Sequence, residues 1–321
     1  MVNRSAILLV GGRGTRLQPL TNNTPKPMLQ VAGVPFTEHQ ILKARDAGIS
    51  EIVLATSFKA ELFEPYFGDG ADFGISIKYA VEEVALGTGG AISNAAQVLS
   101  SANEPNGRAP IAIFNGDVLS GHDLNAQFEF HEAKGADVTL YLTKVEDARA
   151  YGAVELDDFG KVSAFNEKME NPPTNTINAG CYIFNRDVID TIPFGKVISV
   201  ERETFPKLLN DGAKVFGFID TSYWLDIGTP AALLKASRDL VFEKKLEFLA
   251  LEGSKISPSA KVNGGSVIGR AAQIGDAAQI SGSVIGDGAK VGVGANLLNC
   301  FVAEGFEVPE HVIAENNFFG Y

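Results

Sequence analysis

Residues that could bind phosphate are concentrated near the start of the chain, in the stretch Gly11–Met28 with the sequence GGRGTRLQPLTNNTPKPM. Its glycines lack a Cβ, so the backbone can turn sharply and bring N–H groups close to an anion. Arg16 supplies a planar guanidinium suited to phosphate oxygens, and Lys26 supplies a second, compact positive charge. Prolines between the two cations partly fix their separation before an anion binds. The stretch therefore predicts a phosphate-binding loop.

Two common phosphate-binding motifs do not fit this stretch. It lacks the GK[ST] ending of a P-loop, and a dinucleotide fingerprint counted from Gly12 would need a third glycine where Leu17 stands. A glycine turn with two solvated cations is the simpler structural alternative. The apolar run at residues 6–10 predicts a short strand buried on both faces, which would place the loop at the end of a sheet.

The elements that follow alternate between strands and helices, which predicts a doubly wound, mostly parallel α/β sheet with right-handed crossovers. Ligands of such sheets bind beyond the carboxyl ends of the strands. Asp117 ends one of these strands after Asn-Gly; it could form a turn, but its position favours a ligand role. Strands are expected at 51–56, 75–81, 111–117 and 136–145, and helices at 35–48, from about 59 to 68, and at 124–134.

The composition is that of a globular protein, with 45% hydrophobic and 21% charged residues among 321. A net charge of -12 argues against nucleic acid or an anionic membrane as partners. The apolar run near the start is too short for a signal peptide or a membrane span. Cys181 and Cys300 form neither a disulfide framework nor a zinc motif. We therefore expect a reduced, cytoplasmic protein, and one that forms a homo-oligomer.

Aliphatic residues recur every six positions in the last part of the chain, after a helix expected at about 231–250. The repeat GSVIGRAAQIG at 265–275 returns as GSVIGDGAKVG at 282–292. This period predicts a left-handed parallel β-helix with about three coils before Val312. We expect a catalytic domain at 1–235, a linking helix at 236–250 and the β-helix at 251–321. The repeating positions are Ile256, Val262, Ile268, Ile274 and Ile280, and after a shift of one residue Ile285, Val291 and Leu297.

The stretch Gly11–Met28 resembles the signature GGxGTRLxPLTxxxPKPM of the sugar-1-phosphate nucleotidyltransferases, and the chain is most similar to the mannose-1-phosphate guanylyltransferases within that family. Gln18 and Gln30 stand where arginine and proline are common. The resemblance covers roughly residues 1–235 and implies a Rossmann-like nucleotidyltransferase sheet. It also implies Mg²⁺-dependent transfer of a guanylyl group from GTP to a hexose 1-phosphate. The resemblance implies that this hexose 1-phosphate is mannose 1-phosphate, so the products are GDP-mannose and pyrophosphate.

The nucleotide-binding residues follow from the same resemblance, in which Glu82 falls on the base-reading position. Guanine offers two adjacent donors, N1–H and N2–H₂, and a carboxylate accepts from both, whereas uracil or thymine offers one donor beside an acceptor. Glu82 therefore favours GTP. The implied nucleotide-binding residues are Leu9, Gly11, Gly12, Gly14, Thr15, Arg16, Lys26, Glu82, Gly87, Thr88 and Asp117.

Three further segments resemble the sugar and metal motifs of the family. Residues 151–154 resemble YGxV, residues 165–168 resemble FxEKP with Met169 in place of the proline, and residues 223–230 resemble a second acidic motif. Mg²⁺ prefers hard oxygen ligands, usually one or two carboxylates completed by phosphates and water. The resemblance implies sugar-phosphate contacts at Gly152, Glu167, Lys168 and Asn178, magnesium ligands at Asp117 and Asp226, and a catalytic set of Arg16, Lys26, Asp117, Lys168 and Asp226.

Three alternatives are open at this point. The first is a nucleotidyltransferase that uses UTP or dTTP with glucose 1-phosphate. The second is a β-helix acyltransferase. The repeats contain no histidine, which argues against it. The third is a non-catalytic subunit that senses a sugar nucleotide; such a protein could lose a phosphate-binding cation or a metal carboxylate, and here all five candidates are present.

Overall fold

The computed structural model describes residues 4–100 and 109–321. The chain forms two compact units. The sheet unit comprises the residues up to Gly12 together with Thr37–Trp224, and the β-helix unit comprises Arg13–Phe36 and Leu225–Tyr321. The phosphate-binding stretch is therefore divided after Gly12. The expected boundaries of the catalytic domain at residue 235 and of the linking helix at residue 250 stay predictions. No helix within the described residues has the length and apolar character needed to cross a bilayer.

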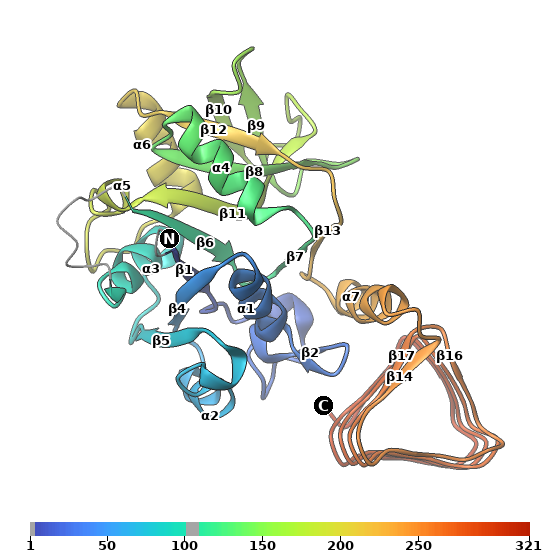
Figure 1. Cartoon of the computed structure of the whole chain (residues 1–321). Helices are drawn as coiled ribbons and strands as arrows, with labels where there is room; N and C mark the ends of the chain where they lie inside the picture. The colour runs from blue at the N-terminus through green and yellow to red at the C-terminus, as the bar shows by residue number, and fades with distance from the viewer. Residues whose placement is uncertain (1–3, 101–108) are drawn as a thin grey trace. The chain divides into compact units, whose positions relative to one another are not determined.

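The sheet unit is built on a nine-stranded mixed sheet within the described residues, with the order β10-β9-β11-β6-β1-β4-β5 (Figure 1). Strands β6, β1, β4 and β5 are parallel, as the alternating pattern predicts, and β11 is antiparallel to β6. Beside this path, β8 pairs with β11 and β12. The bounds are β1 Arg4–Leu9, β4 Ile49–Thr56, β5 Ser76–Val81, β6 Pro110–Asn115, β7 Val118–Ser120, β8 Val138–Lys144, β9 Gly152–Leu156, β10 Val162–Glu167, β11 Thr176–Asn185 and β12 Val215–Ile219.

Helix α4 begins and ends at capping residues. Asp123 accepts a hydrogen bond from the Ala126 N–H at 3.0 Å at the start of α4, and Gly135 ends the helix with a φ of 53°. The helix expected from about residue 59 to 68 is only the single turns η3 and α2, because Pro65 in the first turn of α2 has no N–H with which to continue a helix from η3. The bounds are α1 Phe36–Asp46, η3 Ala60–Leu62, α2 Glu64–Phe67, α3 Gly87–Ala96, α4 Leu124–Lys134, α5 Arg186–Ile189, η6 Val200–Thr204 and α6 Phe205–Asn210.

The core of the sheet unit comes from strands that are buried on both faces. Ile7, Val53, Ile113 and Tyr182, on β1, β4, β6 and β11, have no solvent exposure. Such strands need apolar residues at consecutive positions rather than at alternate ones, which explains the continuous runs in the sequence. The central strands therefore form a rigid base for the turns that follow them.

The β-helix unit carries three parallel sheets that form a triangular coil (Figure 1), which confirms the predicted left-handed β-helix. Within the described residues, one face holds five strands and each of the other two holds four. Three complete coils, β14 to β22, lie before Val312 as expected, and the array then continues through β23 to β26. The array begins at Phe248 and reaches Phe319, which stands in register with Val302 in place of an aliphatic residue. The faces are β14 Phe248–Ala250, β17 Ser266–Ile268, β20 Val284–Ile285, β23 Phe301–Val302 and β26 Phe318–Phe319; β15 Lys255–Ile256, β18 Gln273–Ile274, β21 Lys290–Val291 and β24 Glu307–Val308; and β16 Lys261–Asn263, β19 Gln279–Ser281, β22 Asn296–Leu298 and β25 Ile313–Glu315.

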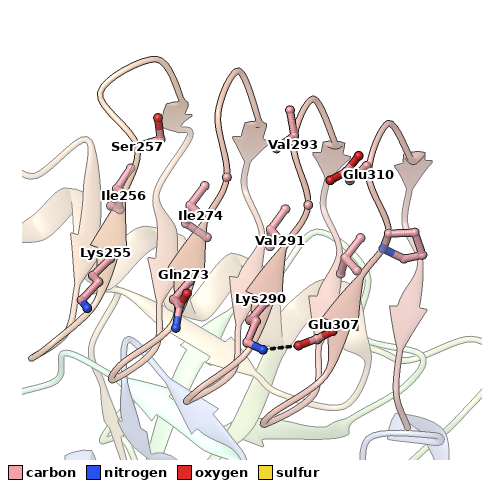
Figure 2. Close-up of a pocket in the computed structure, with 14 residues that line it drawn as sticks. Lys255, Ile256, Ser257, Gln273, Ile274, Lys290, Val291, Val293, Glu307 and Glu310 are labelled. Atoms are coloured by element: carbon pink, nitrogen blue, oxygen red, sulfur yellow. Dashed lines mark hydrogen bonds and ion pairs between the residues drawn. The ribbon is translucent and has the colours of Figure 1, made fainter.

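Figure 2 shows one face of the coil, on which Lys290 and Glu307 of successive rungs form an ion pair. A hollow of about 670 Å³ lies on this face. Neither a histidine nor a cysteine is among the described residues that line it, and it holds no predicted site residue. The chemistry therefore has to be sought elsewhere in the molecule.

Helix α7 (Pro230–Glu243) begins the second segment of the β-helix unit, after β13 (Trp224–Asp226). It ends earlier than the expected residue 250, and Lys245 follows with a positive φ of 59°. Within this unit α7 contacts the hairpin of β2 (Gln30–Val31) and β3 (Val34–Pro35). The Ala32 N–H in the hairpin turn donates to the buried Ser237 Oγ at 2.8 Å. The phosphate-binding stretch is thus anchored to α7.

Candidate active site

The phosphate-binding stretch folds back on itself at Gly14, which has a φ of 62°. A Cβ on this glycine would lie 2.7 Å from Lys26 Cβ, and the Thr21 hydroxyl donates to the Gly14 carbonyl at 3.0 Å. Only glycine allows both the turn and the close approach. The fold therefore brings Lys26 next to the start of the loop that carries Thr15 and Arg16, and the Arg16 side chain is exposed.

Asp226 and Arg16 approach each other within the β-helix unit. A Cβ on Gly228 would lie 3.1 Å from Arg16 Nη2 and 3.1 Å from Asp226 Oδ2. Gly228 is buried and leaves the space between the two charged groups free of a side chain. A guanidinium and a carboxylate at one point provide both charges that a metal-bound phosphate needs, because the cation meets phosphate oxygens and the carboxylate meets the metal.

In the sheet unit, the carboxyl ends of the central strands come close through glycines. The Gly116 N–H donates to the Leu9 carbonyl at 2.9 Å, and a Cβ on Gly116 would lie 2.2 Å from that oxygen. The Ser57 hydroxyl donates to the Gly11 carbonyl at 2.6 Å. Asp117, which follows Gly116, therefore lies at the same edge of the sheet as the start of the glycine loop.

Glu82 follows β5 at this edge and is 9% exposed. Its backbone N–H donates to the Thr56 carbonyl at 2.8 Å, and its Oε2 accepts from the Leu86 N–H at 3.0 Å. Oε1 is buried without a hydrogen-bond partner among the described residues. Burial raises the pKa of this carboxyl, against the lowering effect of the Leu86 N–H. A buried acceptor without a partner fits a ligand that brings N–H donors.

The glycine-rich start of α3 packs against the segment before η6. Gly87 has a φ of 69°, and a Cβ there would lie 2.6 Å from the Ile198 carbonyl oxygen. The Thr88 hydroxyl donates to Glu201 Oε2 at 2.8 Å and accepts from the Val200 N–H at 2.9 Å. In this structure the Thr88 side chain thus holds two segments together, while its predicted role at the nucleotide stays a prediction.

The predicted sugar-phosphate residues lie on adjacent strands. Glu167 of β10 is paired with Gly152 of β9, and Lys168 Nζ lies 3.4 Å from Glu167 Oε1. The Lys168 N–H donates to the Tyr151 carbonyl at 3.1 Å, and Lys168 has a positive φ of 50°. The Lys168 side chain is 59% exposed, whereas that of Glu167 is 17% exposed. The carboxylate is held in place, and the ammonium group is accessible to an anion.

Asn178 lies at the start of the neighbouring strand β11, where Ile177 pairs with Ala153 of β9. Its Nδ2 donates to the Tyr182 hydroxyl at 2.8 Å, and its Oδ1 accepts from the Gly180 N–H at 3.2 Å. These bonds fix the irregular start of the strand. The side chain is only partly buried, so its predicted contact with the sugar stays a prediction.

Two residues near this edge, Trp224 and Ser57, make contacts that the sequence analysis did not predict. The Trp224 indole N–H donates to the Ala179 carbonyl at 3.0 Å, and its ring meets Tyr151 edge-on with centroids 5.3 Å apart. Ser57, described above, is the second. Ser57 could have been found because it follows a buried strand as Gly11 does, but no comparable pattern marks the contact of Trp224.

Strand order and register therefore arrange the candidate residues of the sheet unit in a row along one edge. Parallel strands end at the same edge, and the antiparallel strand β11 begins there. Strand β9 joins this end of β11 through the pair Ile177 and Ala153, which brings Gly152, and Glu167 opposite it on β10, beside Asn178. From β5 to β10 the row reads Glu82, Gly11 with Gly12, Asp117, Asn178, Gly152, and Glu167 with Lys168.

The donor set can be compared with what magnesium requires. No group of three or more His, Cys, Asp or Glu side chains in residues 4–100 and 109–321 could hold a metal by itself. Mg²⁺ needs only one or two carboxylates when phosphates and water supply the other oxygens. Asp117 in the sheet unit and Asp226 in the β-helix unit are each a hard oxygen ligand of this kind, so each carboxylate by itself has the chemistry to bind a metal that arrives with a nucleotide.

Comparison with known proteins identifies the family of this chain. The family model for nucleotidyl transferases matches residues 5–242, and the chain belongs to this family. It is 48% identical to mannose-1-phosphate guanylyltransferase of Mycobacterium tuberculosis over 285 residues, 86% of this chain and 77% of the relative. It is 33% identical to probable mannose-1-phosphate guanylyltransferase 2 of Oryza sativa subsp. japonica over 322 residues, 98% of this chain and 86% of that one. Among solved structures, HddC from Yersinia pseudotuberculosis matches with a TM-score of 0.62 and 28% identity, covering 74% of this chain and 99% of that chain.

Proposed function

We propose that this protein transfers a guanylyl group from GTP to mannose 1-phosphate, forming GDP-mannose and pyrophosphate. The observation that carries the proposal is the row of residues along the sheet edge. A carboxylate that can read a base stands at one end, a lysine for a sugar phosphate stands at the other, and the glycine loop and Asp117 lie between them. A sugar nucleotide has the same sequence of parts: base, ribose, phosphates and sugar.

Support for guanine comes from Glu82 and from the relatives. The buried Glu82 Oε1 has no partner in the described chain, and guanine N1–H and N2–H₂ are donors that a carboxylate accepts together. The M. tuberculosis relative is named a mannose-1-phosphate guanylyltransferase. HddC from Y. pseudotuberculosis, 28% identical to this chain, has been solved in complex with GMP-PN.

The reaction needs positioning and charge neutralisation rather than a general base. The second pKa of a phosphate monoester is about 6, so the sugar phosphate is largely dianionic at neutral pH and is its own nucleophile. Arg16 and Lys26 would bind the triphosphate, and Lys168 would orient the attacking phosphate oxygen. Asp117 and Asp226 would hold Mg²⁺, which when bound neutralises charge on the reacting phosphate.

The test is pyrophosphate release by the purified protein with each of the four common NTPs and dTTP against mannose 1-phosphate, glucose 1-phosphate and galactose 1-phosphate. We expect GTP with mannose 1-phosphate to give the highest kcat/KM. A preference for UTP or dTTP with glucose 1-phosphate would contradict the proposal and favour the first alternative. No release with any pair, while GDP-mannose still binds in calorimetry, would favour the non-catalytic subunit.

A further inference from the structure

We infer that Gln40 and Lys43 of α1 are positioning residues that hold the turn carrying Asp117, and thereby set the affinity of the site for Mg²⁺. The inference rests on the proposed function, in which Asp117 is a magnesium ligand. Asp117 lies between β6 and β7, and the two residues bind the backbone on both sides of it.

Gln40 holds the turn from within the core. It is 5% exposed, and its Nε2 donates to the Asn115 carbonyl at 2.8 Å and to the Val118 carbonyl at 3.1 Å. Both amide hydrogens are thus used on carbonyls two residues before and one residue after Asp117. One side chain therefore fixes the width of the turn.

Lys43, one helical turn further along α1, holds the end of β7. Its Nζ donates to the Ser120 carbonyl at 2.7 Å and to Ser120 Oγ at 3.1 Å, and lies 3.0 Å from His122 Nδ1. These three acceptors match the three hydrogens of an ammonium group. No carboxylate is among these three partners, so the charge is matched by hydrogen bonds to neutral groups.

His122 continues this anchor into the sheet. Since Lys43 has only hydrogens to offer, Nδ1 of His122 accepts, and the neutral ring then carries its proton on Nε2. Nε2 lies 3.1 Å from Gln127 Oε1, which it can therefore reach as a donor, and the ring stacks on Tyr141 with centroids 3.9 Å apart. Gln127 has no solvent exposure. The anchor for Lys43 is therefore held on its far side by a buried hydrogen bond, and movement of the end of β7 would disturb it.

Contacts of this kind raise the affinity of a site for its metal, because they hold the ligand in its binding position before the metal binds. Loss of such outer contacts lowers metal affinity by about 10- to 100-fold in known sites. Replacement of a residue that merely stabilises the fold would lower the free energy of unfolding and leave the metal requirement unchanged.

The experiment titrates Mg²⁺ against Gln40→Met and Lys43→Met in the full chain with two readouts: the affinity for GTP, measured by calorimetry without sugar phosphate, and the rate of pyrophosphate release. Arg45→Met is the matched control, because Arg45 lies on the same helix and bonds to Asp46 and the Phe73 carbonyl instead. We expect the half-saturating Mg²⁺ concentration to rise on the order of tenfold in both variants, with excess Mg²⁺ restoring much of the rate. The KM for the sugar phosphate should stay unchanged, and Arg45→Met should match wild type.

Asp117→Asn, measured beside these variants, separates the two ideas. If it raises the Mg²⁺ requirement and folded Gln40→Met and Lys43→Met do not, the positioning role is wrong and the proposed function stands. If Asp117→Asn has no effect on the requirement, the metal role of Asp117 is wrong and the inference falls with it. Should the methionine variants not fold, Gln40→Asn is the milder test: its shorter amide cannot reach both carbonyls, and an unchanged Mg²⁺ requirement there would also overturn the inference.

Discussion

Gly152 and Glu167 lie opposite each other on β9 and β10, and a Cβ on Gly152 would lie 2.9 Å from Glu167 Oε2. The same Cβ would lie 2.7 Å from Phe165 Cζ. A side chain at position 152 would therefore displace the carboxylate that stands beside Lys168. The glycine is required by this contact and not by an unusual backbone angle.

Gly152→Ala should raise the KM for the sugar phosphate roughly tenfold, because overpacking of about 1–3 kcal/mol has to be relieved by moving Glu167 or Phe165. GTP binding should be unchanged. Steady-state kinetics at saturating GTP measures the effect, and Ser163→Ala on the exposed face of the same hairpin is the control. An unchanged KM would contradict this prediction.

Lys168→Ala should weaken use of the sugar phosphate and spare GTP binding, because it removes the exposed cation beside Glu167 and leaves the other end of the row intact. Calorimetry with GTP and kinetics with mannose 1-phosphate separate the two effects. Lys161→Ala on the same hairpin serves as control. Loss of GTP binding in Lys168→Ala would mean that the two substrates are placed the wrong way round.

Asp226→Asn should leave the fold intact and remove most Mg²⁺-dependent turnover, since a neutral amide is a poor ligand for Mg²⁺. The loss should correspond to several kcal/mol of transition-state stabilisation. Asp239→Asn, on α7 in the same unit, should retain wild-type turnover. Rates near those of wild type at ordinary Mg²⁺ concentration would exclude Asp226 as a ligand.

Glu82→Gln should reduce the preference for GTP over UTP and dTTP, because the new NH₂ faces a guanine donor and both groups lose an acceptor. An unmatched buried donor costs about 1–3 kcal/mol, so the preference in kcat/KM should fall roughly ten- to a hundredfold. The exposed neighbour provides the control Glu83→Gln.

Inosine triphosphate, which lacks N2–H₂, tests the same contact without a mutation. Wild type should discriminate against it, and Glu82→Gln should do so less. Equal use of GTP and ITP by wild type would show that the carboxylate does not read the guanine edge.

Lys43 should give a distinctive pH dependence of stability. Burial lowers the pKa of Lys43 to about 8, although Cys181, Asp220 and Asp123 act in the opposite direction. In the unfolded chain a lysine titrates near 10.4, so the unfolded state binds more protons between pH 8 and 10.4, and stability from this group rises with pH. The free energy of unfolding of wild type relative to Lys43→Met should therefore increase from pH 8 to pH 10, measured by urea denaturation. The difference in free energy of unfolding between wild type and Arg45→Met should not change over this pH range. If wild type instead loses stability relative to Lys43→Met from pH 8 to pH 10, the lowered pKa of Lys43 is wrong.

Much of the fold could be predicted because the controlling signals are local. Continuous apolar runs mark β1, β4 and β6, and a six-residue period marks the β-helix. The end of α7 could not be found in this way, since residues 231–250 contain no glycine, proline or asparagine and the helix stops at a lysine with positive φ. The array continues past Val312 through β25 and β26, where Phe319 stands in register with Val302, and an aromatic residue does not mark a rung in an aliphatic repeat.

The site shows the same division between local and distant signals. The phosphate loop is recognisable as a string, and strand order follows from the alternating pattern. The engagement of Thr88 with Glu201 joins positions 113 apart, and no periodicity reports it. Gln40 and Lys43 sit on a helix among apolar neighbours, where their sequence resembles an ordinary half-buried face. Side chains that bind backbone carbonyls leave no pattern in the sequence.

The hydrogen bond between Ala32 and Ser237 bears on how such a chain can be shortened or fused to other proteins. A fragment that ends at Trp224 keeps every strand of the large sheet but loses the helix to which the phosphate loop is anchored. A fusion junction placed beyond Glu243 would retain that helix, and one placed beyond Leu251 would also keep the leucine whose side chain packs against Gly33. Exchange of C-terminal modules between relatives should therefore succeed when the junction follows α7 and fail when it precedes it.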